Sequence, residues 1–204
     1  MKPPTVILAG GRSSRMGAEK ALLPLNGRPL LAHVVGVLRP QCSDILINAN
    51  SDPARFDAFD LPVLPDPIPG LQGPLAGLLT GMTWALQHNP DAPHLLTTPC
   101  DTPFLPTDLV VRLQRMLAET GSDIAVARDA QRLHPAIGLW PVRLAPLLAE
   151  HLESSVSRSI HGWLEKFHVC AATFEADALC NLNTPHDRNE AETRFAKPIA
   201  EPEI

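Results

Sequence analysis

Short apolar segments alternate with longer amphipathic segments along most of this chain of 204 residues. Short apolar runs bounded by polar or turn residues are typical of strands buried on both faces. They predict strands over 5–9, 44–47, 62–64, 94–97, 123–127, 136–140 and 169–174. The longer segments predict helices over 29–38, 74–87, 108–119, 142–152 and 159–167, and a last helix that follows 181–185 and ends at 195.

Strands that alternate with helices predict an α/β fold, in which a mostly parallel sheet carries helices on both faces. The strand expected over 136–140 is a candidate for an antiparallel member of the sheet. No linker or internal repeat interrupts residues 1–195, so we expect one domain there. Residues 196–204 hold two prolines and mixed charge, and they are expected to form a flexible C-terminal tail.

The composition excludes several classes of protein. The net charge is -5, whereas a partner that is a nucleic acid or an anionic membrane would require a basic surface. The chain begins without the pattern of a signal peptide, and no apolar run approaches the roughly 18 residues of a membrane span. The four cysteines form no CxxC pair, and buried free thiols in a reducing compartment are the simplest interpretation. We therefore expect a cytoplasmic protein that contacts neither nucleic acid nor membrane.

A glycine-rich segment, LAGGRSSRMGAEK, follows the first expected strand directly. Gly10, Gly11 and Gly17 allow the backbone to turn tightly, and successive N–H groups in such a loop bind phosphate oxygens. Arg15 and Lys20 add two cations suited to a triphosphate. The segment matches neither the Walker pattern nor the dinucleotide-binding pattern of glycines. A solvated loop with incidental charges is the alternative interpretation.

The segment TTPCDTP places Asp101 just after the strand expected over 94–97. A carboxylate at the carboxyl end of a parallel strand, near a phosphate-binding loop, is well placed to bind Mg²⁺. Mg²⁺ takes one or two carboxylates and completes its shell with phosphate oxygens and water, so a single Asp suffices. A role as the N-cap of the following turn is equally compatible with this position.

Two pairs of asparagines follow expected strands, Asn48 with Asn50 and Asn181 with Asn183. Asparagine is depleted inside strands, and two amides at alternate positions indicate one ligand-facing side. Turn or capping chemistry competes with this interpretation, above all for Asn181 and Asn183, which precede the last helix. His134 lies just before the strand expected over 136–140, where contact with an anionic substrate and a structural role are both open.

Taken together, these segments resemble the MobA-like nucleotidyltransferases, and specifically the molybdenum cofactor guanylyltransferases. The resemblance covers nearly the whole chain except the tail. It is carried, in order, by LAGGRSSRMGAEKALLPLNGRPLLAH, LINAN (46–50), LPDP, GPLAG (73–77), TPCDTPFLP (98–106), HPAIGLW (134–140) and NLNTP (181–185). Members of this family often have one more residue between Met-Gly and the lysine than MGAEK has.

The resemblance implies a single-domain, three-layer α/β/α Rossmann-like nucleotidyltransferase fold. It implies transfer of GMP from GTP to the phosphate of molybdenum-bound molybdopterin, with Mg²⁺ as cofactor. The family's nucleotide contacts correspond to Leu8, Ala9, Gly10, Lys20, Asn48, Asp66 and Asp101. Asp101 is also the implied Mg²⁺ ligand, and Gly11 beside Gly10 leaves room for a purine.

Arg15, Lys20 and Asp101 are the expected catalytic residues, and the pterin-side candidates are Arg15, Asn181, Asn183 and His134. The product is expected to pass to molybdoenzymes through transient contacts made by a monomer. A cytidylyltransferase or a sugar-phosphate nucleotidyltransferase is the nearest alternative. A non-catalytic module that binds the cofactor and passes it on is the alternative from another class.

Overall fold

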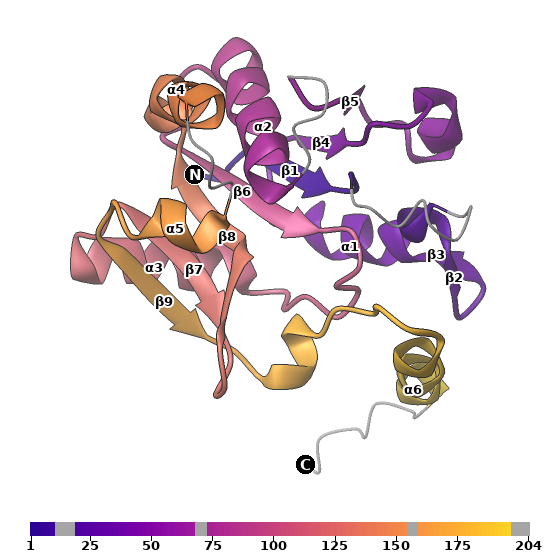
Figure 1. Cartoon of the computed structure of the whole chain (residues 1–204). Coiled ribbons are helices and arrows are strands. Elements are labelled where there is room, and N and C mark those ends of the chain that lie inside the picture. Colours follow the sequence, from indigo (N-terminus) through magenta and orange to yellow (C-terminus); the bar gives the residue numbers. More distant parts are fainter. Residues whose placement is uncertain (11–18, 68–72, 155–158, 197–204) are drawn as a thin grey trace.

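One central sheet runs through the computed structural model, which describes residues 1–10, 19–67, 73–154 and 159–196. Within these residues the sheet has seven strands in the order β5-β4-β1-β6-β8-β7-β9 (Figure 1). The strands are β1 (Thr5–Leu8), β4 (Ile45–Asn48), β5 (Val63–Leu64), β6 (His94–Pro99), β7 (Ile124–Arg128), β8 (Leu133–Pro141) and β9 (Val169–Thr173).

Strand directions agree with the mostly parallel sheet predicted above. Strand β1 pairs parallel with both β4 and β6, β4 with β5, and β7 with β9. Strand β8 pairs antiparallel with both of its neighbours, β6 and β7, which confirms the antiparallel option for the strand expected over 136–140. The strands other than β8 therefore all end at one edge of the sheet, called here the carboxyl edge.

Helices cover both faces of the sheet and give three layers (Figure 1). They are α1 (Leu30–Leu38), α2 (Pro74–His88), α3 (Leu109–Thr120), α4 (Ala145–Ser154), α5 (Ile160–Leu164) and α6 (Pro185–Ala196). One buried cluster joins the sheet to α1 and α3, and a second joins the opposite face to α2, α4 and α5. Helix α6 lies outside these layers and contacts β2 of a small hairpin.

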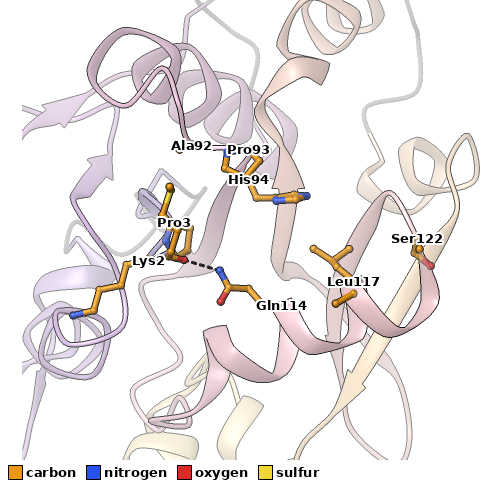
Figure 2. Close-up of a pocket in the computed structure, with 11 residues that line it drawn as sticks. Lys2, Pro3, Ala92, Pro93, His94, Gln114, Leu117 and Ser122 are labelled. Carbon is orange, nitrogen blue, oxygen red and sulfur yellow. Dashed lines mark hydrogen bonds between the residues drawn. The ribbon is translucent and has the colours of Figure 1, made fainter.

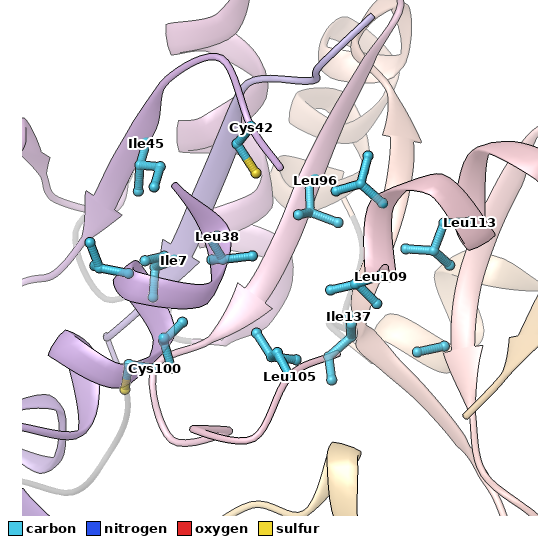
Figure 3. Close-up of a cluster of buried hydrophobic side chains, with 14 of the residues drawn as sticks. Ile7, Leu38, Cys42, Ile45, Leu96, Cys100, Leu105, Leu109, Leu113 and Ile137 are labelled. Carbon is cyan, nitrogen blue, oxygen red and sulfur yellow. The ribbon is translucent and has the colours of Figure 1, made fainter. Parts of the chain in front are cut away.

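Alternation of side chains along the strands supplies both cores. Ile7 and Ile47 point toward α1 and α3 in the first cluster, part of which is drawn in Figure 3. Val6 and Leu46, each one residue earlier, belong to the second cluster with α2. Strands buried on both faces in this way explain why their sequences are continuously apolar rather than alternating.

The three tryptophans are core residues, as the sequence predicts. Trp140 and Trp163 are fully buried, and Trp84 is 5% exposed. The Trp140 indole N–H donates a 2.8 Å hydrogen bond to the Thr97 hydroxyl on the neighbouring strand. This bond satisfies a polar group that would otherwise be buried without a partner.

A two-stranded hairpin of β2 (Pro24–Leu25) and β3 (Arg28–Pro29) was not predicted. Its turn residues Asn26 and Gly27 have φ of 48° and 73°. Asn-Gly with both φ values positive is the preferred two-residue hairpin turn, so the sequence carried a signal for it. Pro29 belongs to β3 of this hairpin, so the helix expected over 29–38 begins at Leu30 instead.

Two expected helices are shorter than predicted. The segment expected over 142–152 begins with a 3₁₀ turn (Val142–Leu144) before α4, and the segment expected over 159–167 is helical only from Ile160 to Leu164. Tight turns end α5, since the N–H groups of Lys166 and Phe167 bond to carbonyls three residues earlier. Residues 197–204 of the predicted tail lie outside the described residues. In the described part of the chain, no helix is long and apolar enough to cross a bilayer.

Candidate active site

Several of the predicted site residues meet at the carboxyl edge of the sheet. Leu8 at the end of β1 is paired with Asn48 at the end of β4 and with Pro99 at the end of β6. This register aligns the ends of three central strands. It also explains why Asp101, two residues beyond β6, shares an edge with the residues that follow β1.

Lys20 and Asp101 form an ion pair at this edge. Lys20 begins a short 3₁₀ helix (Lys20–Leu22), and its ammonium donates to Asp101 Oδ2. The same ammonium donates a 2.6 Å hydrogen bond to Asn183 Oδ1. The structure therefore joins Lys20 to the segment TPCDTP and to the segment NLNTP, although MGAEK is shorter than its counterpart in many family members.

The Asp101 carboxylate is largely withdrawn from solvent. Its side chain is 10% exposed, and the carboxylate oxygen that does not accept from Lys20, Oδ1, is buried with no hydrogen-bond partner in the described residues. Within the described residues its side chain accepts a hydrogen bond from Lys20 and none from a backbone N–H of the following turn. This geometry favours a role in the site over the alternative of a turn cap.

The side-chain amides of Asn48 and Asn50 both donate hydrogen bonds to the carboxylate of Asp66. The Asn48 amide donates to Asp66 Oδ1 at 3.1 Å, and the Asn50 amide donates to Asp66 Oδ2 at 2.8 Å. The Asp66 N–H in turn donates to Asn50 Oδ1 at 2.8 Å. Asn48 is only 2% exposed, so this network is fixed between β4 and the segment after β5. The sequence indicated both asparagines, and the structure brings them to Asp66.

Two glycines leave room for the Asn48 side chain. A Cβ on Gly77, in the first turn of α2, would lie 2.3 Å from Asn48 Oδ1 and 2.6 Å from Leu8 Cδ2. A Cβ on Gly10, after β1, would lie 3.3 Å from Asn50 Nδ2. Gly77 was not among the predicted site residues. The sequence could have indicated it, because Gly77 is the last residue of the segment GPLAG, which contributes to the family resemblance.

The end of β1 and the two residues after it lie at the centre of this edge, between β4 and β6. These residues are Leu8, Ala9 and Gly10. The Ala9 N–H donates to the Asn48 carbonyl at 2.9 Å, and the Leu8 carbonyl accepts from the Cys100 N–H at 3.1 Å. The backbone at these predicted nucleotide contacts is thus hydrogen-bonded to the end of β4 on one side and to the residue after β6 on the other. Gly11 and Arg15, which the sequence also indicates, lie outside the described residues.

The segment 181–184 lies against Asp101. The Leu182 N–H donates a 2.9 Å bond to the Asp101 carbonyl, which places half-buried Asn181 and exposed Asn183 beside it. Helix α6 is not capped by an asparagine side chain, because Thr184 Oγ1 accepts from the Asp187 N–H at 3.1 Å. The Asn183 side chain instead accepts from Lys20.

His134 makes a structural contact. Its Nε2 lies 2.8 Å from Asp129 Oδ2, and both side chains are 8% exposed. Asp129 Oδ1 accepts from the backbone N–H groups of Gln131 and Arg132, so Asp129 holds the β7–β8 hairpin together. The bond with His134 and these two amides lower the pKa of Asp129 to about 2. No hydrogen bond between described residues joins His134 to Lys20 or Asp101.

Three of the four cysteines are buried free thiols, as expected. Burial raises the pKa of Cys42 to about 11 and that of Cys100 to about 12. The expectation is wrong for Cys180, which is exposed because it lies in the connection between β9 and α6. Within the described residues, no cluster of three His, Cys, Asp or Glu side chains could hold a metal ion.

A separate cavity of about 470 Å³ opens at the opposite edge of the sheet (Figure 2). Its walls come from the residues before β1, the start of β6 and the end of α3, including Pro3, His94 and Leu117. Burial, and then the positive charge of Arg143, lower the pKa of His94. The cavity shares no residue with the Lys20–Asp101 site, so it does not belong to the predicted active site.

Comparison with known proteins finds similar sequences over most of the chain. Residues 5–168 match the family model described as the MobA-like NTP transferase domain. A protein of Rhodopseudomonas palustris (strain BisB5) named molybdenum cofactor guanylyltransferase is 46% identical over 193 residues, which cover 93% of this chain and 92% of the relative. A protein of the same name from Rhizobium meliloti (strain 1021) is 42% identical over 198 residues, with 93% and 90% covered.

Solved structures share the fold at lower identity. Molybdopterin-guanine dinucleotide biosynthesis protein A from Archaeoglobus fulgidus superposes with a TM-score of 0.74 at 21% identity, covering 95% of this chain and 98% of that one. A 4-diphosphocytidyl-2C-methyl-D-erythritol synthase from Anaerococcus prevotii has the same TM-score at 12% identity and 96% coverage of both chains. Two proteins with such different names share this fold, so the fold alone does not identify the substrate.

Proposed function

The chain belongs to the MobA-like NTP transferase family, and we propose that it transfers GMP from GTP to the terminal phosphate of molybdenum-bound molybdopterin. The products are pyrophosphate and the guanine dinucleotide form of the cofactor. The observation that carries the proposal is the Lys20–Asp101 pair at the carboxyl edge. It lies in a chain that is 46% identical to a guanylyltransferase over nearly its whole length.

The reaction forms one bond, from a molybdopterin phosphate oxygen to the α-phosphorus, and breaks one bond, from the α-phosphorus to the pyrophosphate oxygen. The nucleophile is already anionic, so no general base is required. The protein must bring two anions together and stabilise the charge that develops on the leaving pyrophosphate. Cations and N–H donors at the carboxyl edge serve that purpose.

Asp101 is the residue that we propose to hold Mg²⁺. Its buried Oδ1 has no hydrogen-bond partner among the described residues, and a carboxylate oxygen is a ligand that Mg²⁺ prefers. A bound Mg²⁺ supplies positive charge to triphosphate oxygens. A single carboxylate is sufficient because phosphate oxygens and water complete the shell.

Lys20 supplies a positive charge beside Asp101. An ammonium has three N–H donors, and here two of them bond to Asp101 and Asn183. We propose that Lys20 directs a donor to a phosphate oxygen of GTP, and that Arg15 adds a second cation to the phosphates. Arg15, Asn181 and Asn183 are the proposed contacts on the pterin side. His134, the fourth candidate, would have to contact the pterin beside its bond to Asp129.

The nucleoside of GTP is proposed to lie on Leu8, Ala9, Gly10 and Gly11, next to Asn48 and Asp66. The support for this placement is the hydrogen bond between buried Asn48 and half-buried Asp66, and the absence of a Cβ at Gly10. Amides and a carboxylate held in fixed positions suit the donors and acceptors of guanine or ribose. Gly10 followed by Gly11 leaves space for a purine.

Turnover with GTP and with CTP, each with Mg²⁺ and molybdenum-bound molybdopterin, tests the proposal. We expect pyrophosphate release and a guanine dinucleotide product with GTP, and at least a tenfold lower rate with CTP, about 1.4 kcal/mol of discrimination. Preferential use of CTP or of a sugar phosphate would reassign the substrate. Binding of the cofactor without pyrophosphate release would indicate a non-catalytic carrier.

We further propose that the enzyme acts as a monomer in the cytoplasm and transfers its product to molybdoenzymes through transient contacts. The acidic net charge of -5 supports the part of this proposal that leaves out nucleic acid and anionic membranes as partners. Light scattering coupled to size-exclusion chromatography tests the monomer directly. A stable dimer at micromolar concentration would contradict it.

A further inference from the structure

The turn that precedes α6 is held by hydrogen bonds on both sides of Asn183. The Leu182 N–H bonds to the Asp101 carbonyl at 2.9 Å. The Asp187 carboxylate accepts from the next two backbone N–H groups, that of Asn183 at 2.7 Å and that of Thr184 at 2.8 Å, both through Oδ2. The residue before Asn183 is thus bonded to the loop of Asp101. The N–H groups of Asn183 and of the residue after it are bonded to the first turn of α6.

This arrangement exceeds what a helix cap requires. An ordinary capping box pairs the Thr184 hydroxyl with the Asp187 N–H, and the Asp187 side chain with the Thr184 N–H. The bond to Asn183 is additional, and it orients the peptide group of a residue that lies outside the helix. The hydroxyl and amides of Thr184 and Asn183 lower the pKa of Asp187, so this acceptor is an anion at neutral pH.

The fixed backbone determines where the Asn183 side chain lies. Its Oδ1 accepts from Lys20 at 2.6 Å, and the same Lys20 ammonium bonds to Asp101. A continuous chain of contacts therefore runs from Asp187 through Asn183 to Lys20 and Asp101. Among the described residues no hydrogen bond or ion pair joins Asp187 to Lys20, and Asn183 is the residue that contacts both.

Helix α6, which carries Asp187, is packed against the rest of the protein. Leu182 and Ala191 pack with Leu25 and Leu30 of the hairpin region in a small buried cluster. The Arg194 guanidinium lies 4.2 Å from the centre of the Phe104 ring, in the loop that follows Asp101. Figure 1 shows this helix beside the hairpin and apart from the main layers. Its docking restricts the position of the 181–184 turn.

We propose that Asp187 is a positioning residue for nucleotidyl transfer. It fixes the backbone of Asn183, and the Asn183 amide oxygen then holds the Lys20 ammonium beside the Asp101 carboxylate. The effect on turnover rests on the function proposed above. The effect on Lys20 does not, because it concerns contacts within the protein itself.

Kinetics of Asp187→Ala, with Thr184→Ala as the matched control, test the proposal. Thr184→Ala removes the other half of the capping box and leaves the bond from Asp187 to Asn183. We expect Asp187→Ala to lower kcat/KM about tenfold, mainly through kcat, and Thr184→Ala to lower it less than about threefold. Asp187→Glu should restore most of the activity, since it keeps a carboxylate that can accept from the Asn183 N–H as well as from the Thr184 N–H. Equal losses in the two alanine variants would reduce Asp187 to a helix cap and overturn the proposal.

A double variant tests whether the effect passes through Asn183. When Asn183→Ala is already present, adding Asp187→Ala should change kcat/KM by less than about twofold. Losses that multiply would show that Asp187 acts by another route, and the proposal would fail. Circular dichroism verifies that each variant is folded, and Asp187→Leu, which also lacks an acceptor for the Asn183 N–H, replaces Asp187→Ala if the latter is not.

A measurement on the free protein separates this proposal from the proposed function. The chain has four lysines, so the side-chain ammonium signal of Lys20 in a ¹H–¹⁵N spectrum can be assigned with Lys20→Arg. Asp187→Ala and Asn183→Ala should both shift or broaden this signal, and Thr184→Ala should not. An unchanged signal in Asp187→Ala would overturn the positioning role, whatever the activity. Wild-type protein that releases no pyrophosphate would refute the proposed function, while the signal still decides the role of Asp187.

Discussion

The Lys20 ammonium bonds to the Asp101 carboxylate, although 81 positions separate the two residues in the chain. The parallel pairing of β1 with β6 creates this contact by bringing their carboxyl ends together. The two side chains are 17% and 10% exposed, so each largely compensates the charge of the other away from bulk water. Loss of either residue leaves a poorly solvated charge, in addition to removing a group from the proposed site.

Asp101→Ala is expected to abolish turnover, with a loss of at least about a hundredfold in kcat, because it removes the proposed Mg²⁺ ligand. Pyrophosphate release from GTP in the presence of Mg²⁺ and molybdenum-bound molybdopterin measures the effect. Asp108→Ala is a suitable control, since this exposed carboxylate lies just before α3 and pairs only loosely with Arg112 at 3.7 Å. Near-normal activity of Asp101→Ala would remove the metal assignment.

Gly77→Ala is expected to destabilise the protein by about 1–3 kcal/mol and to raise the KM for GTP. The added Cβ would overlap Asn48 Oδ1, so either α2 or the Asn48 side chain must move. Gly36→Ala is the matched control, because Gly36 is an exposed residue of α1 whose added Cβ meets no atom within 4 Å. That variant should be stabilised by about 0.5–1 kcal/mol. Urea unfolding and GTP saturation curves measure both effects, and equal behaviour of the two variants would contradict the crowding at Gly77.

Asp66→Ala is expected to raise the KM for GTP more than it lowers kcat. The substitution leaves the Asn48 and Asn50 amides without the carboxylate that orients them, whereas it leaves the Lys20–Asp101 pair intact. Asp57→Ala, at an exposed position of the 3₁₀ helix Pro53–Phe59 between β4 and β5, serves as the control. A fall in kcat with an unchanged KM would place Asp66 on the reacting phosphates instead of the nucleoside.

Asp129 is expected to contribute to stability in a pH-dependent manner. Its pKa is about 2 in the folded protein against an ordinary value of 3.8, so the unfolded chain takes up a proton at higher pH than the folded one. The stabilisation is therefore fully present above about pH 4 and is lost as the pH falls toward 2. The free energy of unfolding in urea, followed from pH 6 to pH 2, should decline less steeply in Asp129→Asn than in wild type. Parallel curves would show that the bond to His134 has no such effect.

Much of the fold was predictable because its local and global signals agree. The apolar runs of β1, β4 and β6 are buried on both faces, and such strands carry a continuous hydrophobic pattern that can be recognised locally. The β2–β3 hairpin was missed, although Asn26 and Gly27 form its preferred turn, because its strands are too short to show an alternating pattern. The boundaries of α4 and α5 depend on 3₁₀ turns, which have weak sequence signals.

The sequence by itself determined which types of candidate site residue are present and in what order they follow the strands along the chain. It placed a glycine-rich segment after the first strand, an aspartate after a later one, and asparagines at strand ends. Only the tertiary structure decided which of these groups meet. It joined Lys20 to Asp101 and Asn183, bonded His134 to Asp129, and packed Gly77 against the Asn48 side chain. The physical reason is that such contacts depend on strand pairing and helix docking over long chain separations, whereas sequence patterns report only the nearest turns.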